Sequence, residues 1–249
     1  MNKFNSELDF ALRNFIANPE NFLDGLTLVN SLHSIPVIAA AQPYAIAMQG
    51  QKVIPVFTNK TDLDNFKKEH PSAKGQDWVE RSSIEVLEEA VTHRLHGLVF
   101  NIKKAGDFAN STIFKSSELV QLINTYTTLL NDVLGEENQE RQPLQRQYFV
   151  PVIILTSEDG NYQRSYPALA IEDETYIPAF SSIPSFAKWY NDGDLGYPFR
   201  LAKGMVMTWT LEQIAHPAQG ESGVGQTKGV VIDPLNENQT LVDWASIEE

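Results

Sequence analysis

Three side chains near the middle of the chain have the types and the spacing of a metal site. Glu89, His93 and His96 lie at positions i, i+4 and i+7, so a helix would place all three on one side. Two imidazoles and a carboxylate can hold zinc or iron and leave one coordination position open. A metal-dependent or hydrolytic enzyme that uses these residues is therefore one hypothesis for this chain.

The apolar residues of the same segment favour a different interpretation of this triplet. The face expected to be buried is defined by Ile84, Leu87, Val91 and Leu95. That face turns the three polar side chains largely toward solvent, where histidines near a helix C-terminus interact favourably with its dipole. The second half of the chain has no equivalent triplet, since its one histidine is His216. We therefore reject the metal site and predict no cofactor.

Other catalytic signatures are missing from the sequence. The glycine-rich segment 220–229 ends in Lys228 and Gly229, which lead into an apolar strand, whereas a phosphate loop opens a helix. We interpret it as a surface insertion. There is no Gly-x-Ser-x-Gly motif and no cysteine, which excludes disulfides, thiolate metal sites and cysteine nucleophiles. We predict no catalytic residue.

Two equivalent turns between a strand and a helix remain as candidate binding positions. Thr58 and Asn59 follow one apolar strand, and Ser181 and Ser182 follow another. Helix capping is the simplest role for all four side chains. Because helix N-termini attract anions, the same four residues are our candidate binding surface.

Composition limits the classes of partner. The net charge is −13, and residues 135–249 hold 7 Lys and Arg against 17 Asp and Glu. A strongly acidic half repels phosphate backbones and anionic lipid, so we expect another protein as the partner, and neither nucleic acid nor membrane. The sequence shows no run of about 18 apolar residues and no secretion signal. We expect a cytoplasmic protein.

The apolar segments recur in the same order in the two halves of the chain. The matching segments are 35–38 with 150–153, 54–58 with 177–181, and 97–102 with 229–234. Three matches in one order predict a duplicated unit. We place the N-terminal helices and the first copy in residues 1–134, a polar linker in 135–146 and the second copy in 147–249.

One unit can be assigned from strand and helix signals. Apolar runs predict strands at 35–41, 44–48 and 53–57, and the turn at 49–52 suggests that these three form an antiparallel meander; a further buried strand is predicted at 98–102. Ser82 and Glu85 have the spacing of a capping box. In the second copy we expect helices at about 205–215 and 241–247. The fold class is α+β with a mixed sheet, in two tandem copies with helices packed on the sheet.

These motifs resemble the SseB N-terminal domain. The resemblance rests on the Ile-Pro-Val-Phe-Thr strand (54–58) before a capped helix, and on the later Gly-Val-Val-Ile-Asp-Pro strand (229–234). It covers roughly residues 20–130 and 146–249. The family pattern ends its last strand in Asn-Pro, where this chain has Asn101-Ile102 and Asp233-Pro234.

The resemblance to the SseB family implies a bacterial cytosolic protein and transfers no catalytic residue. With the missing catalytic signatures, it favours a non-catalytic protein-binding or regulatory module. The alternatives are the metal-dependent or hydrolytic enzyme and a small-ligand sensor in the cleft between the repeats.

Overall fold

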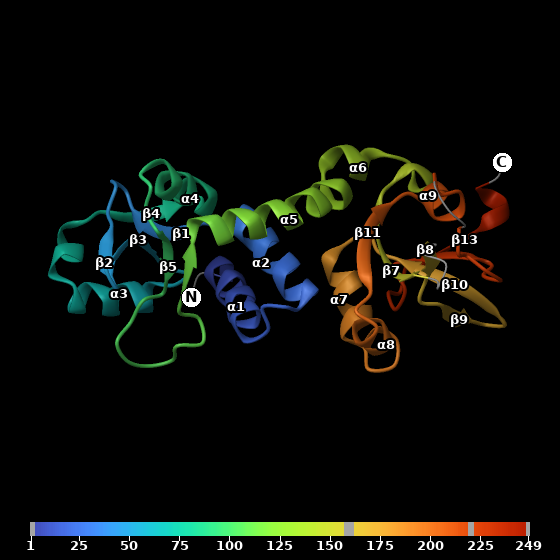
Figure 1. Ribbon diagram of the computed structural model, residues 1–249, viewed down its shortest axis with the longest axis horizontal. Helices are drawn as coiled ribbons and strands as arrows, with labels where there is room; N and C mark the ends of the chain where they lie inside the picture. Colours follow the sequence, from blue (N-terminus) through green and yellow to red (C-terminus); the bar gives the residue numbers. More distant parts are fainter. Residues whose placement is uncertain (1–2, 157–161, 219–221, 248–249) are drawn as a thin grey trace. The chain divides into compact units, whose positions relative to one another are not determined.

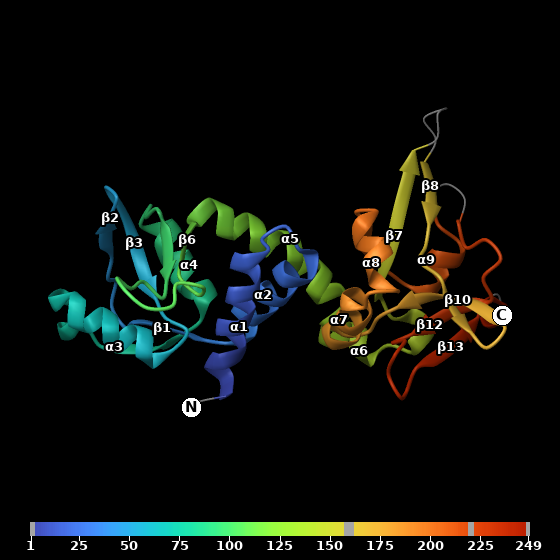
Figure 2. The same ribbon diagram turned by 90° about the horizontal axis from the view of Figure 1, so that it is seen from below.

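The computed structural model describes residues 3–156, 162–218 and 222–247. The chain forms two compact units, Met1–Thr127 and Thr128–Glu249, and the division falls inside the long helix α5 (Ser116–Leu134). Each unit has its own sheets and its own apolar core (Figures 1 and 2). Within the described ranges, no helix has the length and apolarity needed to cross a membrane.

The first unit contains two groups of strands. The strands are β1 (Val37–Ala40), β2 (Ile46–Met48), β3 (Gln51–Val56), β4 (Trp78–Arg81), β5 (Gly97–Phe100) and β6 (Thr112–Lys115). A mixed sheet has the order β2-β3-β5-β6, in which β3 and β5 are parallel and both outer strands are antiparallel to their neighbours. Strands β1 and β4 form a separate antiparallel pair. A bridge between Ile38 and Phe57 connects β1 to the residue that follows β3.

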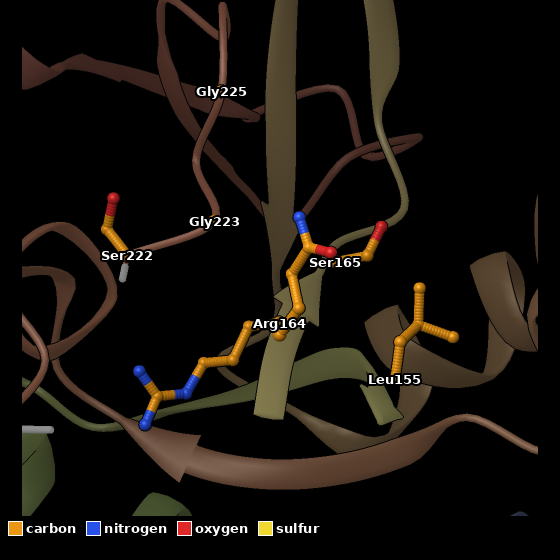
Figure 3. A pocket seen from close by; sticks show the side chains of 7 residues that line it. Leu155, Arg164, Ser165, Ser222, Gly223 and Gly225 are labelled. Atoms are coloured by element: carbon orange, nitrogen blue, oxygen red, sulfur yellow. The ribbon is translucent and has the colours of Figure 1, made fainter. Parts of the chain in front are cut away.

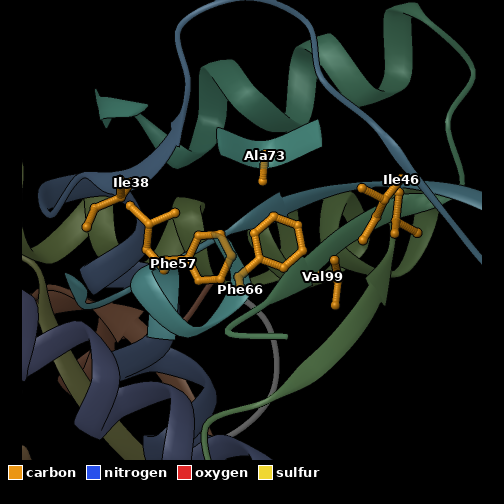
Figure 4. Packing of buried hydrophobic residues seen from close by; sticks show 8 residues of the cluster. Ile38, Ile46, Phe57, Phe66, Ala73 and Val99 are labelled. Atoms are coloured by element: carbon orange, nitrogen blue, oxygen red, sulfur yellow. The ribbon is translucent and has the colours of Figure 1, made fainter. Parts of the chain in front are cut away.

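Helices cover the sheet of the first unit. They are α1 (Lys3–Ala17), α2 (Phe22–Ser34), α3 (Lys60–Glu69), the 3-10 helix η1 (Pro71–Gly75), α4 (Ser83–Thr92) and the first part of α5. Helices α1 and α2 lie side by side (Figures 1 and 2). Helix α3 packs Leu63 and Phe66 against the sheet, where Phe66 contacts Phe57 with ring centroids 5.2 Å apart (Figure 4). These aromatic rings are fully buried, so they supply much of the apolar area that holds α3 in place.

Among the described residues, the second unit repeats this arrangement of strands and has one strand more than the first. Its strands are β7 (Tyr148–Thr156), β8 (Tyr162–Ser165), β9 (Leu169–Ile171), β10 (Glu174–Ala179), β11 (Met205–Trp209), β12 (Gly229–Ile232) and β13 (Thr240–Asp243). A mixed sheet has the order β9-β10-β12-β13, with β10 and β12 parallel. Strand β7 pairs with β11 and β8, and a bridge joins Phe149 to Phe180.

The helices of the second unit are mostly short. They are α6 (Glu136–Glu140), the 3-10 helix η2 (Pro143–Gln145), α7 (Ile183–Asn191), α8 (Gly196–Leu201), α9 (Leu211–Ala215) and the 3-10 helix η3 (Trp244–Ser246). The polar segment 135–146 thus contains α6 and η2. Its Asn138 is buried, and the Asn138 side chain bonds the backbone of Val133 and Gln147.

The strand registers of the two units correspond. In the parallel pairs, residues 53–56 face 97–100 in the first unit, and 176–179 face 229–232 in the second. The fold class is therefore α+β with mixed sheets, as the sequence predicted. The two bridges correct one of the sequence matches, because Ile38 pairs with Phe57 and Phe149 pairs with Phe180. Phe149 takes the place of Ile38, and the match of 35–38 with 150–153 is out of register by four residues.

Four details of the predicted secondary structure are wrong. Strand β1 pairs with β4 and does not join a meander with β2 and β3. Segment 205–215 is a strand followed by a short helix, and segment 241–247 begins in strand β13 and ends in η3. Ser82 makes no capping hydrogen bond, whereas Thr210 and Gln213, at the equivalent place in the second unit, form a complete capping box.

Helix α4 also differs from its prediction. Its buried residues are Ser83, Val86, Leu87 and Ala90, while Val91 is half exposed. The buried stripe is therefore rotated from the predicted one.

Candidate functional site

The residues that follow the parallel strands form a corner in each unit. In sheets with parallel strands, ligands commonly bind beyond the carboxyl ends of the strands. Thr58 and Asn59 follow β3 in the first unit, and Asn101 follows β5. Ser181 and Ser182 follow β10 in the second, and Asp233 follows β12. We call these places the first corner and the second corner.

The same side-chain-to-backbone hydrogen bond occurs in both corners. Asn101 and Asp233 have positive φ angles of 48° and 51°, a left-handed conformation that Asn and Asp tolerate better than most residues. In the first corner, Asn101 Oδ1 accepts a 2.8 Å hydrogen bond from the backbone N–H of Thr58. In the second corner, Asp233 Oδ1 accepts one of the same length from Ser181. The two side chains therefore tie the ends of neighbouring parallel strands together.

The first corner extends this hydrogen bond into a buried polar network. Asp9 of α1 accepts hydrogen bonds from the Thr58 hydroxyl and from Asn110 Nδ2, the latter at 2.6 Å. Asn110 lies in the segment between β5 and β6, and its backbone oxygen accepts a 2.9 Å bond from Asn101 Nδ2. The network therefore joins α1, both central strands and the segment after β5.

A buried ion pair completes the first corner. Lys103 Nζ lies 2.7 Å from Asp62 Oδ1, and the side chains are 6% and 10% exposed. The same ammonium donates to Asn110 Oδ1 at 2.8 Å. Asp62 also accepts from Asn59 Nδ2 at 2.9 Å and from Asn110 Nδ2 at 3.0 Å. Such bonds offset the large cost of removing two charges from water.

The surroundings of Asp9 shift its pKa. Burial acts to raise its pKa, but hydrogen bonds from Thr58, Asn110 and Arg13, with the charge of Arg13, outweigh burial. The pKa of Asp9 is therefore lowered from 3.8. Arg13 Nε lies 2.7 Å from Asp9 Oδ2, and the same guanidinium pairs with Asp107. Asp9 is held as a carboxylate that bonds its neighbours, which does not suit a general base.

The second corner is smaller. The Ser181 hydroxyl donates to Asp233, and Ser182 caps α7 by accepting a 3.3 Å bond from the backbone of Ser185. Ser185 is buried, and its hydroxyl has no hydrogen-bond partner among the described residues. It stands where the first unit has Asp62, three residues after the helix cap. The acid of the first corner is thus replaced by a hydroxyl.

The four candidate binding residues are placed in two separate pairs, one in each unit. Asn59 and Ser182 are the N-caps of α3 and α7. Thr58 is 1% exposed and bonds Asp9 and Asn101, and Ser181 bonds Asp233. Each of these four side chains already has a hydrogen-bond partner within the chain. Whether they bind anything stays a prediction.

The rejected metal triplet does not share one face of a helix. Helix α4 ends at Thr92, His93 is its C-cap, and Arg94 turns the chain with a φ of 52°. Glu89 forms a 2.9 Å ion pair with Arg81. In the part of the chain that the structure describes, no three His, Asp or Glu side chains are grouped to hold a metal ion.

The glycine-rich segment lies partly outside the described residues, which resume at Ser222. Its described end leads into β12, and Lys228 donates a 2.7 Å backbone hydrogen bond to Thr175.

Sequence reasoning missed most of the first corner. The residues that it did not single out as site residues are Asp9, Asp62, Asn101, Lys103 and Asn110. One signal was present, because Asn101 and Asp233 occupy the same place in the matching segments 97–102 and 229–234. A polar residue that ends an apolar strand in both halves is expected to bond the neighbouring strand end.

Comparison with known proteins does not identify the family. No family model matches the sequence, and no curated protein matches it. Among solved structures, the chain is similar to Anabaena Tic22, a protein described under protein transport. The identity is 14%, the match covers 84% of this chain and 92% of that one, and the TM-score is 0.20. At that score the similarity carries no conclusion. The resemblance to the SseB family stays a prediction.

Proposed function

We propose that this chain is a non-catalytic protein-binding module of the SseB type. The observation that carries the proposal is the closure of the first corner. Acids, amides, a lysine and a hydroxyl meet where such folds commonly act on ligands, yet they bond one another. These hydrogen bonds stabilise the fold. We therefore place the protein-binding function on the surface of the chain.

The acidic half of the chain supports a basic partner. Glu172 and Asp173 in the turn between β9 and β10, and Glu174 at the start of β10, are exposed in succession. The net charge of residues 135–249 is −10, from 7 basic and 17 acidic side chains. A field of one sign accelerates association with a partner of the opposite sign and weakens as salt is added.

The test is affinity capture with the full chain and two charge variants. The first variant carries Glu172→Gln, Asp173→Asn and Glu174→Gln. The control neutralises three exposed acids of the first unit, Asp64→Asn, Glu85→Gln and Glu88→Gln. We expect one basic protein to be retained by the wild type and by the control, and to elute from the first variant at a lower salt concentration.

Two results would count against the proposal. One is clean recovery of the chain without a partner from cells grown under several conditions. The other is equal salt sensitivity of the two variants, which would show that the acidic turn plays no particular part.

A further inference from the structure

The strands at the edges of the sheets differ in how well their backbones are protected. An edge strand has a row of backbone N–H and C=O groups with which another chain can pair. Folded proteins prevent such pairing with very short edge strands, with charged residues in the strand, or by covering the edge. An edge strand without these features is therefore a place where another chain can be added.

Most edge strands of this chain are protected in one of these ways. Strands β2 and β9 have three residues each. Strand β1 is buried, and a bridge joins it to Phe57. Strands β4, β6 and β13 contain charged residues, which are Glu80 and Arg81, Lys115, and Asp243. We expect no added strand at these edges.

Strand β8 contains Arg164 and is also covered by the chain itself. Figure 3 shows Gly223 and Gly225 beside this strand. A Cβ at Gly223 would lie 2.3 Å from the backbone oxygen of Arg164, so the segment comes this close only because the residue is glycine. The close approach leaves little room for another chain at this part of β8.

Strand β11 has none of these protective features. It is five residues long and pairs along one side with β7. Segment 205–211 contains no charged residue, no proline and no glycine. Apart from the pairing with β7, no backbone hydrogen bond joins Met205–Trp209 to the rest of the described chain. The outer edge of β11 is therefore open to another strand.

The equivalent strand of the first unit shows what β11 lacks. Strand β4 pairs with β1 as β11 pairs with β7, and Glu80 faces Ile38 where Thr208 faces Phe149. Glu80 of β4 is thus replaced by Thr208, and in the same register Arg81 is replaced by Trp209. One fold therefore contains a protected and an unprotected version of the same edge.

The side chains of β11 add an apolar surface beside this edge. Met205, Met207 and Trp209 lie on one face of the strand, since they alternate with Val206 and Thr208. Met205 is 51% exposed, and Met207 and Trp209 are partly exposed. An added strand would place every second side chain beside these three. Methionine side chains adapt to different partners, which suits such a surface.

The charges of the chain select the kind of partner. A second copy would carry the same net charge of −13 and would be repelled, whereas a basic protein would be attracted. Lys203 precedes β11 and Glu212 follows it, and both are exposed. The basic end of an added segment is therefore favoured beside Glu212. In an antiparallel arrangement, that end is the N-terminal one.

We propose that β11 accepts an extended segment of a basic partner protein as an added antiparallel strand. The segment has apolar residues at alternate positions and lysine or arginine at its N-terminal end. Its backbone pairs with the outer edge of β11, and its apolar side chains lie beside Met205, Met207 and Trp209. This inference rests on the proposed protein-binding function and names the place and the mode of binding.

Hydrogen exchange on the full chain tests the added strand with a synthetic peptide. The probe is acetyl-Lys-Lys-Val-Thr-Val-Thr-Val-amide, which has the charge and the alternation of the proposed segment. We expect it to slow the exchange of β11 amides and to leave β4 unchanged. A control peptide has proline in place of the central valine. Because proline cannot donate to the pairing, it should bind about 5-fold more weakly or worse.

A charge placed in β11 tests whether this edge is responsible. Met205→Lys gives β11 the kind of protection that charged residues give β4, so we expect the probe to bind about 5-fold more weakly or worse. The matched control is Val79→Lys, which makes the same change of charge at an exposed position of β4. Binding to this control should equal binding to the wild type. Circular dichroism checks the fold of both variants.

Three outcomes would overturn the proposal. The first is no added protection of β11 at millimolar peptide. The second is equal weakening by Met205→Lys and Val79→Lys, which would indicate a general effect of charge. The third is protection of β11 that rises with the concentration of the chain alone, which would make a second copy the occupant.

These measurements use no cellular partner, so their failure differs from failure of the proposed function. If the peptide does not bind β11 but a basic protein is captured through the acidic turn, the proposed function stands and the site is wrong. If the peptide binds β11 and no basic protein is captured, the edge is open to added strands and the proposed function fails.

Discussion

The two corners begin with the same hydrogen bond and then diverge. In each, a residue with positive φ directly after one parallel strand accepts from the backbone N–H of the second residue after the other. In the first corner this residue is the amide Asn101, and in the second it is the acid Asp233. The choice follows from the surroundings, since Asn101 must also donate a hydrogen bond and Asp233 only accepts them.

The same hydrogen bond between strand ends is therefore used at two corners that differ in burial. The first corner is covered by α1 and by the segment that carries Asn110, so its polar groups are taken from water and must all be paired. The second corner has neither an acid in place of Asp62 nor a lysine in place of Lys103, because Ser185 and Leu235 stand there. Fewer buried charges need fewer partners.

The largest expected effect comes from replacing Asn101 and Asp233, in separate variants, with the residue type found in the other corner. Asn101→Asp replaces a donor with a carboxylate facing the Asn110 backbone oxygen, in a fully buried place near Asp9. We expect the first unit to lose about 3 kcal/mol or more of its free energy of unfolding. Asp233→Asn keeps an acceptor for the Ser181 N–H and has its own N–H for the Ser181 hydroxyl, so we expect a loss of about 1 kcal/mol or less.

Hydrogen exchange on the full chain measures the two effects separately. Protection of β3 and β5 reports the first unit, and protection of β10 and β12 reports the second. Equal losses from the two substitutions would show that the corners are energetically alike, and the comparison would fail.

The two units should also respond differently to acid. The folded-state pKa of Asp9 is lowered from 3.8, so its contribution to stability is present above about pH 4 and is lost as the pH falls through the lower folded value. We expect the protection of β3 and β5 to fall in this window in the wild type. Asp9→Asn should lower stability at neutral pH by about 1–2 kcal/mol and make the decline in acid shallower.

The matched control for Asp9 is Asp64→Asn, which removes an exposed carboxylate of α3 outside the network. It should leave the acid profile of the first unit unchanged. An Asp9→Asn variant with the wild-type acid profile would contradict the role given to Asp9, because some other group would then control the decline.

The sequence predicted the central strands because they are continuous apolar runs. Segments 53–57 and 98–102 are strands β3 and β5, apart from their last residues. Strand β6 was missed, since Thr112–Lys115 is short and alternates in exposure at the edge of the sheet. Segment 205–215 was assigned wholly to a helix, but the β-branched and aromatic residues of Met205–Trp209 fit a strand paired with β7.

The first corner depends on contacts that no local pattern shows. Thr58 and Asn59 could be found because they end a strand and begin a helix. Asp9 and Asn110 are 101 residues apart in the chain, and an acid on the polar side of an amphipathic helix looks like a solvated one. The apolar periodicity of α1 predicts which side faces the core, and it does not show that a polar side chain meets a partner there.

The helix caps of the two units give the smallest expected effect. Thr210 accepts a 3.2 Å bond from the Gln213 backbone, and Gln213 Oε1 accepts a 2.9 Å bond from the Thr210 N–H. Ser82 occupies the equivalent place before α4 and makes no such bond, although its sequence has the same spacing. Thr210→Ala should therefore cost about 1 kcal/mol, and Ser82→Ala only a few tenths. Urea titration of both variants, followed by exchange of the α9 and α4 amides, compares them. Equal costs would mean that the shared sequence spacing, and not the bond seen at Thr210, determines how much each cap stabilises its helix.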